Sequence, residues 1–187
     1  MQNPEPYDPL DYTHLAENVV RALLDQPLQA MPPATPFSGV GVYAVWYEGE
    51  LEWYQNVCGE RRPIYVGSAV PTGGRKGGTG QPRGKRLYNR LRQHGRSIEQ
   101  AENLRLNDFS CRYLVVVPVW IGLAERFLIE HFGPVWNTIV DGFGNHDPGR
   151  GRRDMKRPRW DILHPGRHWA GKLRAEETPE EIARELM

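Results

Sequence analysis

Residues 40–47 alternate between two faces, and a period of two is typical of a β-strand. The even positions, from Val40 to Trp46, are apolar and form one face. The odd positions form the other face, where Tyr43 lies on the same side as Gly41. The pattern therefore predicts a strand that carries a tyrosine beside a glycine.

Two further segments have the composition of strands. Residues 64–66 are Ile-Tyr-Val and precede Gly67, so the side chain of Tyr65 points to the same side as Gly67. Residues 109–117 are rich in β-branched residues, which is typical of a central strand. The first two strands would bring two tyrosines close to an open patch of glycine backbone, where a phosphate could approach.

Apolar residues at helical spacing predict three longer helices, over residues 15–25, 87–96 and 120–132. Gly133 and the proline after it end the third helix. The apolar stripe of the first helix could cover the core of its own subunit or meet a second copy of the chain. Thr178 and Glu181 form a capping-box pattern that predicts a short terminal helix.

Length and composition indicate one domain over residues 1–187, because 187 residues with 39% hydrophobic content can form one well-packed core with extensions. The longest apolar stretch, residues 113–120, is far shorter than the roughly 20 residues needed to cross a bilayer. The first residues lack a basic-then-apolar export pattern, so we expect a cytoplasmic protein with no membrane partner. Cys58 and Cys111 stand apart, which indicates reduced thiols.

Positive charge is concentrated in two blocks, although the formal net charge is +1. Residues 61–98 contain ten Lys and Arg residues and no Asp or Glu. Residues 144–174 contain nine Lys and Arg residues against Asp147, Asp154 and Asp161. A solvated surface usually mixes signs, so these blocks favour a phosphate-rich partner. The alternative is that they are loops kept soluble by charge.

The first cationic block contains a glycine-rich segment, residues 71–84, that cannot form a packed core. We expect it to be a DNA-contacting loop that becomes ordered on binding. A nucleotide-binding P-loop is excluded, because Thr79 stands where that motif requires glycine, and no serine or threonine follows Lys85. The candidate DNA contacts in this block are Arg75, Lys76, Arg83, Lys85 and Arg86.

Glu125 is the most informative acidic residue, because it falls on the apolar stripe of the helix predicted over residues 120–132. Glu130 instead lies on the opposite, solvated side, where Arg126 is its i,i+4 partner. Burial of an unpaired carboxylate is costly, so Glu125 should meet a cation. That cation is either an arginine in a buried salt bridge or a divalent metal.

Several residues resemble, in order and spacing, the signature of the GIY-YIG nucleases. The two triplets of that signature match Gly41-Val42-Tyr43 and Tyr65-Val66-Gly67, with valine in the isoleucine position both times. The family's helical arginine, its metal-binding glutamate and its later asparagine match Arg90, Glu125 and Asn137. His94 projects from the same helix face as Arg90 and resembles the histidine of the restriction-endonuclease branch.

This resemblance covers roughly residues 39–140 and implies an α+β fold, an α/β sandwich with a small, mostly antiparallel sheet flanked by helices. Residues 1–38 would be a helical lead-in. Residues 141–187 would be a basic, DNA-contacting extension with a terminal helix. The longer insertion after Gly67 suggests a specialised loop that reads the substrate.

The resemblance implies hydrolysis of DNA phosphodiester bonds that leaves 5′-phosphate ends. Glu125 would hold one Mg²⁺, for which Mn²⁺ can substitute, because a hard cation prefers oxygen ligands. Arg90 would clamp the scissile phosphate. Asn137 would hold the site in shape through hydrogen bonds.

The same resemblance makes Tyr43 the candidate general base. A phenol is a poor base at neutral pH unless nearby cations depress its pKa, and His94 and the metal could do so. Tyr65 would orient the water or the phosphate. The division of roles among Tyr43, Tyr65 and His94 stays open.

The second cationic block is the expected reader of DNA sequence, through Arg150, Arg152, Arg153, Lys156, Arg157 and Arg159. Arginine reads guanine through N7 and O6, which favours GC-rich sites, although phosphate contact is its more frequent use. Together with His94 and residues 161–170, this plan resembles the type II restriction endonucleases that cut CCGCGG. A palindromic site implies a homodimer on double-stranded DNA, and a restriction role implies a companion DNA methyltransferase.

Other interpretations fit parts of the sequence. His146, His164 and His168 raise the possibility of a zinc site, but no cysteine joins them, which favours phosphate contacts or capping. A repair or homing nuclease would use the same chemistry. A catalytically inactive DNA-binding protein is the non-enzymatic alternative, and an intact Tyr43, Arg90 and Glu125 argue against it.

Overall fold

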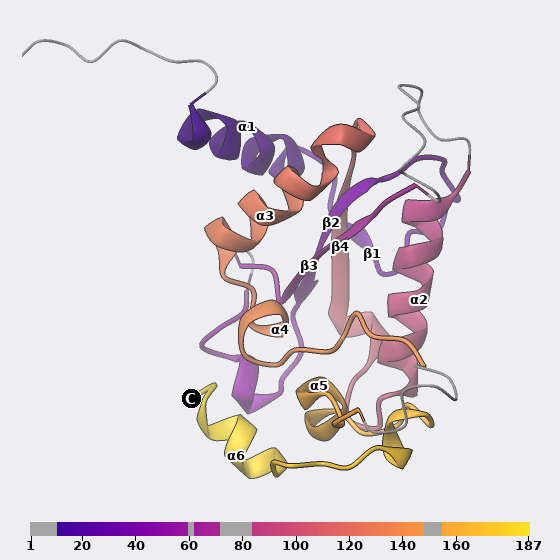
Figure 1. Cartoon of the computed structure of the whole chain (residues 1–187), viewed down its shortest axis with the longest axis vertical. Coiled ribbons are helices and arrows are strands. Elements are labelled where there is room, and N and C mark those ends of the chain that lie inside the picture. The colour runs from indigo at the N-terminus through magenta and orange to yellow at the C-terminus, as the bar shows by residue number, and fades with distance from the viewer. Residues whose placement is uncertain (1–10, 60–61, 72–83, 148–154) are drawn as a thin grey trace, which may run out of the picture.

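A four-stranded antiparallel sheet lies at the centre of the molecule, in the strand order β1-β4-β2-β3 (Figure 1). The computed structural model describes residues 11–59, 62–71, 84–147 and 155–187. Its strands are β1 (Gln29–Ala30), β2 (Gly41–Tyr47), β3 (Tyr65–Ala69) and β4 (Phe109–Val115). The expected α+β fold is confirmed, with β4 as an internal strand and β3 at one edge.

The alternation along β2 divides the interior into two apolar cores. All seven residues of this strand are buried, because helices cover both faces of the sheet. The even positions, such as Val42, pack with residues of α1 (Tyr12–Leu24) and α3 (Ile121–Phe132). The odd positions, such as Val45, pack with residues of α2 (Arg86–Gln100) and of the C-terminal part of the chain.

The three longer helices lie on opposite sides of the sheet, with α1 and α3 on one side and α2 on the other (Figure 1). Helix α1 begins after Asp11, whose side chain accepts a hydrogen bond from the backbone N–H of Thr13. Helix α3 ends at Gly133, which adopts a left-handed conformation with φ of 53°. Within the described residues, no helix has the length and apolar character that a membrane span requires.

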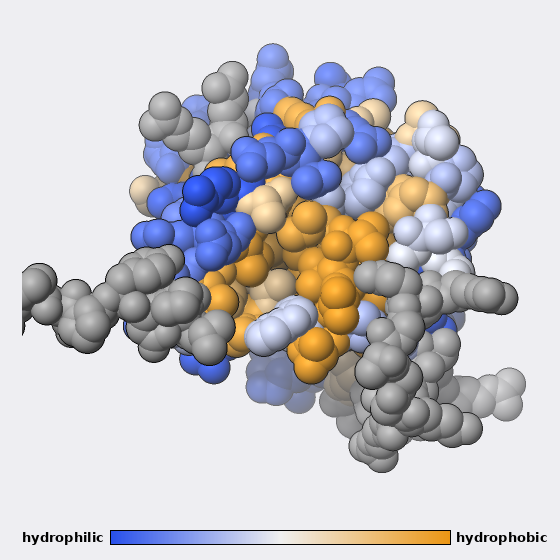
Figure 2. All heavy atoms as spheres, turned by 90° about the horizontal axis from the view of Figure 1, so that it is seen from above, coloured by the Kyte–Doolittle hydropathy of each residue, from blue (hydrophilic) through white to orange (hydrophobic). Residues whose placement is uncertain are grey.

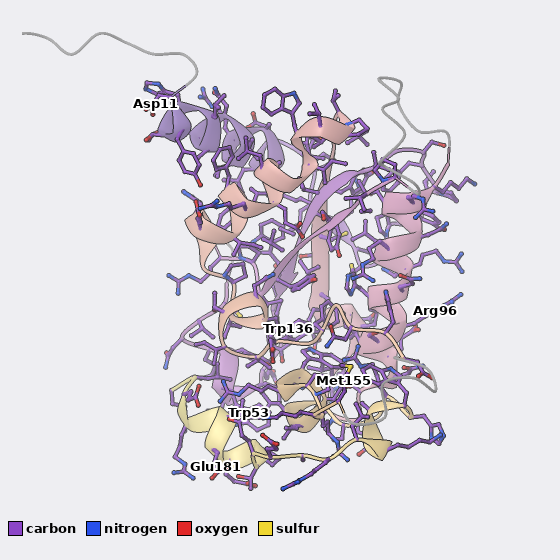
Figure 3. The ribbon with its side chains drawn as sticks, viewed as in Figure 1. Asp11, Trp53, Arg96, Trp136, Met155 and Glu181 are labelled. Atoms are coloured by element: carbon purple, nitrogen blue, oxygen red, sulfur yellow. The ribbon has the colours of Figure 1, made fainter. Side chains whose placement is uncertain are left out.

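Short helices from the second half of the chain lie in the lower half of Figure 1, and short 3₁₀ turns connect other elements. The helices are α4 (Val135–Thr138), α5 (Arg159–Leu163) and α6 (Pro179–Arg184), and the 3₁₀ turns are Glu52–Tyr54, Leu106–Asp108, Pro118–Trp120 and Ala170–Lys172. Helix α6 has the predicted capping box between Thr178 and Glu181. Trp136, labelled in Figure 3, is buried among the rings of Tyr54, Phe109, Phe143, Trp160 and His164.

An apolar groove opens at the top of the molecule, where Figure 2 shows apolar side chains gathered around a hollow. Its lining comes from α1, the end of β4 and α3, and includes Leu15, Val19, Ala22, Leu114, Trp120 and Phe127. Helix α1 also buries Val20 and Leu23 in the core of its own subunit. Part of its apolar stripe therefore covers the interior of this chain, and part lines the groove.

Candidate active site

The glycine of the second triplet makes room for the tyrosine of the first. Tyr43 on β2 lies opposite Gly67 on β3, and a Cβ atom at Gly67 would collide with the Tyr43 hydroxyl. A Cβ atom at Gly41 would likewise collide with the carbonyl oxygen of Leu114. The prediction of an open patch of glycine backbone is therefore wrong, because the Tyr43 phenol and the Leu114 carbonyl already occupy that space.

Tyr43 and His94 form a buried pair. The Tyr43 hydroxyl lies 2.5 Å from Nε2 of His94, which projects from α2 towards the sheet, and both side chains are buried. Burial raises the pKa of Tyr43 well above its ordinary value, with Tyr65 adding to the rise and Arg90 opposing it. Burial lowers the pKa of His94 well below its ordinary value, and the charge of Arg90 lowers it further. At neutral pH the phenol is therefore protonated and the imidazole is neutral.

This charge state differs from the expected one, in which His94 acts as a cation that depresses the pKa of Tyr43. A neutral His94 cannot do so, but it can accept a proton when its own proton is on Nδ1. With that tautomer, the Tyr43 hydroxyl donates a hydrogen bond to Nε2 of the neutral His94.

Tyr65 and Arg90 border this pair. The Tyr65 ring contacts the rings of Tyr43 and His94, with centroid distances of 6.2 and 5.3 Å. Burial raises the pKa of Tyr65, and Arg90 opposes the rise. Arg90, one turn before His94 on α2, donates a hydrogen bond of 2.9 Å from Nη2 to the carbonyl oxygen of Gly144, and its Nη1 lies 2.5 Å from Nε2 of His146.

Glu125 reaches the same site from the opposite side of the sheet. It projects from α3 and accepts a hydrogen bond of 2.8 Å from the hydroxyl of Ser68 on the edge strand β3. Its charge contributes to the raised pKa of both Tyr43 and Tyr65. Because β3 is the outermost strand, the two faces of the sheet meet at this edge, and groups from both faces can act on one substrate.

The partner of Glu125 in the structure is a hydroxyl group. No Lys, Arg or His side chain in the described part of the chain forms an ion pair with it. The buried salt bridge that would compete with a metal role is therefore not found there. On the solvated side of α3, Arg126 and Glu130 form the predicted ion pair at 2.7 Å.

The donor set at Glu125 suits Mg²⁺. Among the residues that the structure describes, no three His, Cys, Asp or Glu side chains form a group able to hold a metal. Mg²⁺ does not require such a cage, because it usually keeps several waters and binds one or two carboxylates together with substrate phosphate. Glu125 is half-buried and its partner Ser68 lines an open polar pocket, which meets that requirement, so Glu125 could hold this ion.

Asn137 protects the exposed edge of the sheet. Its side-chain amide accepts from the backbone N–H of Val66 and donates to the carbonyl oxygen of the same residue, both at 2.8 Å. The N–H of Trp136 adds a hydrogen bond of 2.9 Å to the carbonyl oxygen of Ile64. An edge strand has unpaired backbone groups, and here α4 forms hydrogen bonds with them. These bonds hold in place the strand that carries Tyr65 and Ser68.

A family model described as the Eco29kI GIY-YIG domain matches residues 35–186. The chain belongs to the Eco29kI GIY-YIG family. That membership supports a restriction-type nuclease and implies that the protein binds DNA. A search of curated proteins found no match.

The Eco29kI GIY-YIG match extends well beyond residues 39–140, where the motifs lie. It includes α5 and α6, so the C-terminal extension is part of the family's domain. Two residues of this extension, Gly144 and His146, contact Arg90 in the site. The sequence did not predict either contact. No sequence motif links them to Arg90, because they are more than 50 positions away.

The candidate DNA contacts of this family member divide into three groups. Lys85 and Arg86 are exposed at the start of α2 and line an open polar pocket together with Ser68, Arg90 and His146. Arg75, Lys76, Arg83, Arg150, Arg152 and Arg153 lie outside the described residues. Within the described residues, Lys85 and Arg86 are therefore the candidate DNA contacts of the first cationic block that lie beside the site.

The third group consists of Lys156, Arg157 and Arg159, whose side chains form ion pairs or hydrogen bonds within the protein. Lys156 forms an ion pair with Glu176, and Arg157 donates to the carbonyl oxygens of Ala170 and Gly171. Arg159 forms ion pairs of 2.6 and 2.5 Å with Glu177 and Glu185. DNA contact by these three residues stays a prediction.

Buried histidines make the stability of the protein depend on pH. His164, which was considered as a zinc ligand, lies 2.5 Å from the Tyr54 hydroxyl, and burial lowers its pKa to about 3. The unfolded chain protonates histidine near a pKa of about 6.5. As the pH falls below the pKa of the unfolded state, the unfolded chain takes up a proton that the folded protein does not. The free energy of unfolding therefore decreases as the pH falls through this range.

We expect the free energy of unfolding to fall by about 2 kcal/mol per buried histidine between pH 7.5 and pH 5. His164→Gln keeps an acceptor for Tyr54 but does not titrate, so its stability should decline less steeply over this range. His168→Gln, at an exposed position, should keep the wild-type slope. Urea denaturation at several pH values measures both, and an unchanged slope for His164→Gln would contradict the assignment.

Proposed function

We propose that this protein is a type II restriction endonuclease that hydrolyses phosphodiester bonds of double-stranded DNA with Mg²⁺ as its cofactor. The observation that supports this function best is the convergence of the Tyr43–His94 pair, Arg90 and Glu125 at the β3 edge of the sheet. Phosphodiester hydrolysis needs an activated water, compensation for charge on the phosphate and stabilisation of the leaving oxygen. These side chains provide a group for each need.

The proton of the attacking water passes through Tyr43 in this proposal. The water gives its proton to the phenol oxygen while the Tyr43 proton moves to Nε2 of His94, 2.5 Å away. Burial keeps the phenol protonated and the imidazole neutral, which are the starting states of this transfer, and it also makes the phenol a weaker acid and the imidazole a weaker base. His94 is then the final base, and Tyr43 is the relay.

Arg90 binds the scissile phosphate through its guanidinium hydrogens. A phosphate oxygen can replace the His146 side chain as one of its acceptors, while the carbonyl of Gly144 keeps the guanidinium oriented. Glu125 and the adjacent Ser68 are the residues that would hold the metal. When bound, Mg²⁺ supplies positive charge against the phosphate and the departing 3′ oxygen.

The recognition site that we propose is a short GC-rich palindrome, CCGCGG. Support comes from the arginine-rich composition and from membership in the Eco29kI GIY-YIG family. A palindrome is cut by two active sites related by a two-fold axis, so we propose a homodimer on the DNA. A companion DNA methyltransferase would protect the host, and both proteins would act in the cytoplasm.

Incubation of the purified protein with plasmid DNA and Mg²⁺ tests this function. We expect discrete fragments with 5′-phosphate ends at a GC-rich palindrome, and no cleavage when EDTA removes the metal. Sequencing of the fragment ends identifies the site. Nicks confined to damaged DNA would favour a repair nuclease, and binding without cleavage would favour an inactive DNA-binding protein.

A further inference from the structure

Arg167 is a buried arginine whose hydrogen-bonding capacity is fully used. Its side chain forms an ion pair with Asp161, with bonds of 2.6 Å from Nε and 2.5 Å from Nη2, and both side chains are 2% exposed. The remaining hydrogens are donated to the carbonyl oxygens of Gly142, Phe143 and Asn145 at 3.0 to 3.2 Å. All five N–H donors of the guanidinium therefore have acceptors.

The three carbonyls belong to a segment without regular helix or strand, residues 142–146, which we call the clasp. Backbone in such a segment lacks the repeated hydrogen bonds of a helix or strand, so side chains must fix it. The rings of Trp160 and Trp169 lie 4.5 and 4.9 Å from the Arg167 guanidinium and hold it in place. The conformation of the clasp thus depends on Arg167.

The other side of the clasp contacts the nuclease site. The Phe143 ring stacks on the His94 ring at 4.3 Å and meets the Tyr65 ring edge-on at 4.9 Å. The carbonyl of Gly144 and the side chain of His146 contact Arg90. A Cβ atom at Gly144 would lie 2.9 Å from the Tyr65 hydroxyl, so the clasp backbone packs directly against that residue.

We infer that Arg167 is a positioning residue for the nuclease reaction, acting through the clasp to orient Arg90 and His94. A buried ion pair is a weak stabiliser compared with apolar packing, so the Asp161–Arg167 pair is better explained by the geometry that it imposes. This inference rests on the proposed nuclease function. It also makes the C-terminal extension part of the catalytic machinery in addition to its proposed contact with DNA.

The test compares cleavage with binding in the variant Asp161→Leu/Arg167→Met. Both partners are removed together, because either charge alone would remain buried and unpaired. On an oligonucleotide duplex that wild-type enzyme cuts, we expect the single-turnover rate to fall about 100-fold, since small misplacements of catalytic groups have effects of this size. The Kd for the same duplex, measured without Mg²⁺, should change less than threefold.

Ile182→Ala is the matched control. Ile182 is buried in α6, and its truncation lowers stability by removing apolar packing without removing any hydrogen bond to the clasp. At a temperature where circular dichroism shows both variants folded, Ile182→Ala should keep the wild-type rate. Equal rates for the wild type and the Asp161→Leu/Arg167→Met variant would overturn the inference, whereas a wild-type protein that does not cut DNA would overturn the proposed function instead.

Two further variants keep the inference testable if the double variant fails to fold. Arg167→Lys retains the positive charge but not the five-donor geometry, so it should also lose most of the rate. In an Arg90→Ala background the effect of Arg167→Lys should shrink to less than tenfold, because one of the two residues through which it acts is missing. An undiminished effect in that background, or a wild-type rate for Arg167→Lys alone, would contradict the positioning role.

Discussion

Glu125→Gln is expected to lower the single-turnover rate of DNA cleavage by about 1,000-fold or more and to leave the affinity for DNA within about threefold. Stabilisation of charge in the transition state by a metal contributes several kcal/mol, and each 1.4 kcal/mol corresponds to about tenfold in rate. Glutamine has nearly the same shape and can still accept the hydrogen bond from Ser68. Loss of cleavage would therefore reflect the missing negative charge.

Glu130→Gln is the control for this substitution. Glu130 lies on the same helix, but on the solvated side, where it pairs with Arg126. Exposed pairs of this kind contribute little to stability, so Glu130→Gln should cut DNA at the wild-type rate. Gel-based cleavage and fluorescence anisotropy with a labelled duplex provide the two measurements. Wild-type cleavage by Glu125→Gln would eliminate the metal role.

Tyr43→Phe is expected to slow cleavage by about 100-fold to 10,000-fold, which is the range attributed to general acid–base groups. The substitution removes one oxygen atom and leaves Nε2 of His94 without its partner. An unpaired buried polar group costs about 1–3 kcal/mol of stability, so the melting temperature should fall as well. DNA binding should be retained, because Arg90 and the exposed Lys85 and Arg86 are unchanged.

Tyr47→Phe separates the loss of a hydroxyl from the loss of the proton relay. Tyr47 lies on the same face of β2, and its hydroxyl accepts a hydrogen bond from the N–H of Leu51 at 3.1 Å. Its replacement should reduce stability with no change in the single-turnover rate. Near-wild-type cleavage by Tyr43→Phe would show that the proton leaves the water by another path.

The sequence predicts those parts of the site that depend on local geometry. A period of two along β2 fixes which face carries Tyr43, and a helical turn fixes Arg90 and His94 on one side of α2. The apolar stripe of α3 likewise predicts the inward position of Glu125. These predictions succeed because each follows from the regular repeat of a single element.

Contacts between distant segments are not encoded in any local repeat. Arg157 and Arg159 look like free cations in a basic block, yet the second is held by Glu177 and Glu185, 18 and 26 positions later. The charge state of His94 could not be predicted either, because its burial depends on how α2 packs against the sheet and the clasp. The role of Arg167 depends on three carbonyls about two dozen positions earlier in the chain.

The clasp has a consequence for attempts to redesign this enzyme. One such redesign would graft the C-terminal extension of a relative onto this scaffold in order to change the recognised sequence. Here such a graft of residues 141–187 would also exchange the support beneath Arg90 and His94. A chimaera that keeps residues 142–146, Asp161 and Arg167 from the same parent as α2 preserves that support, and one that divides them would recognise a new site without cutting it.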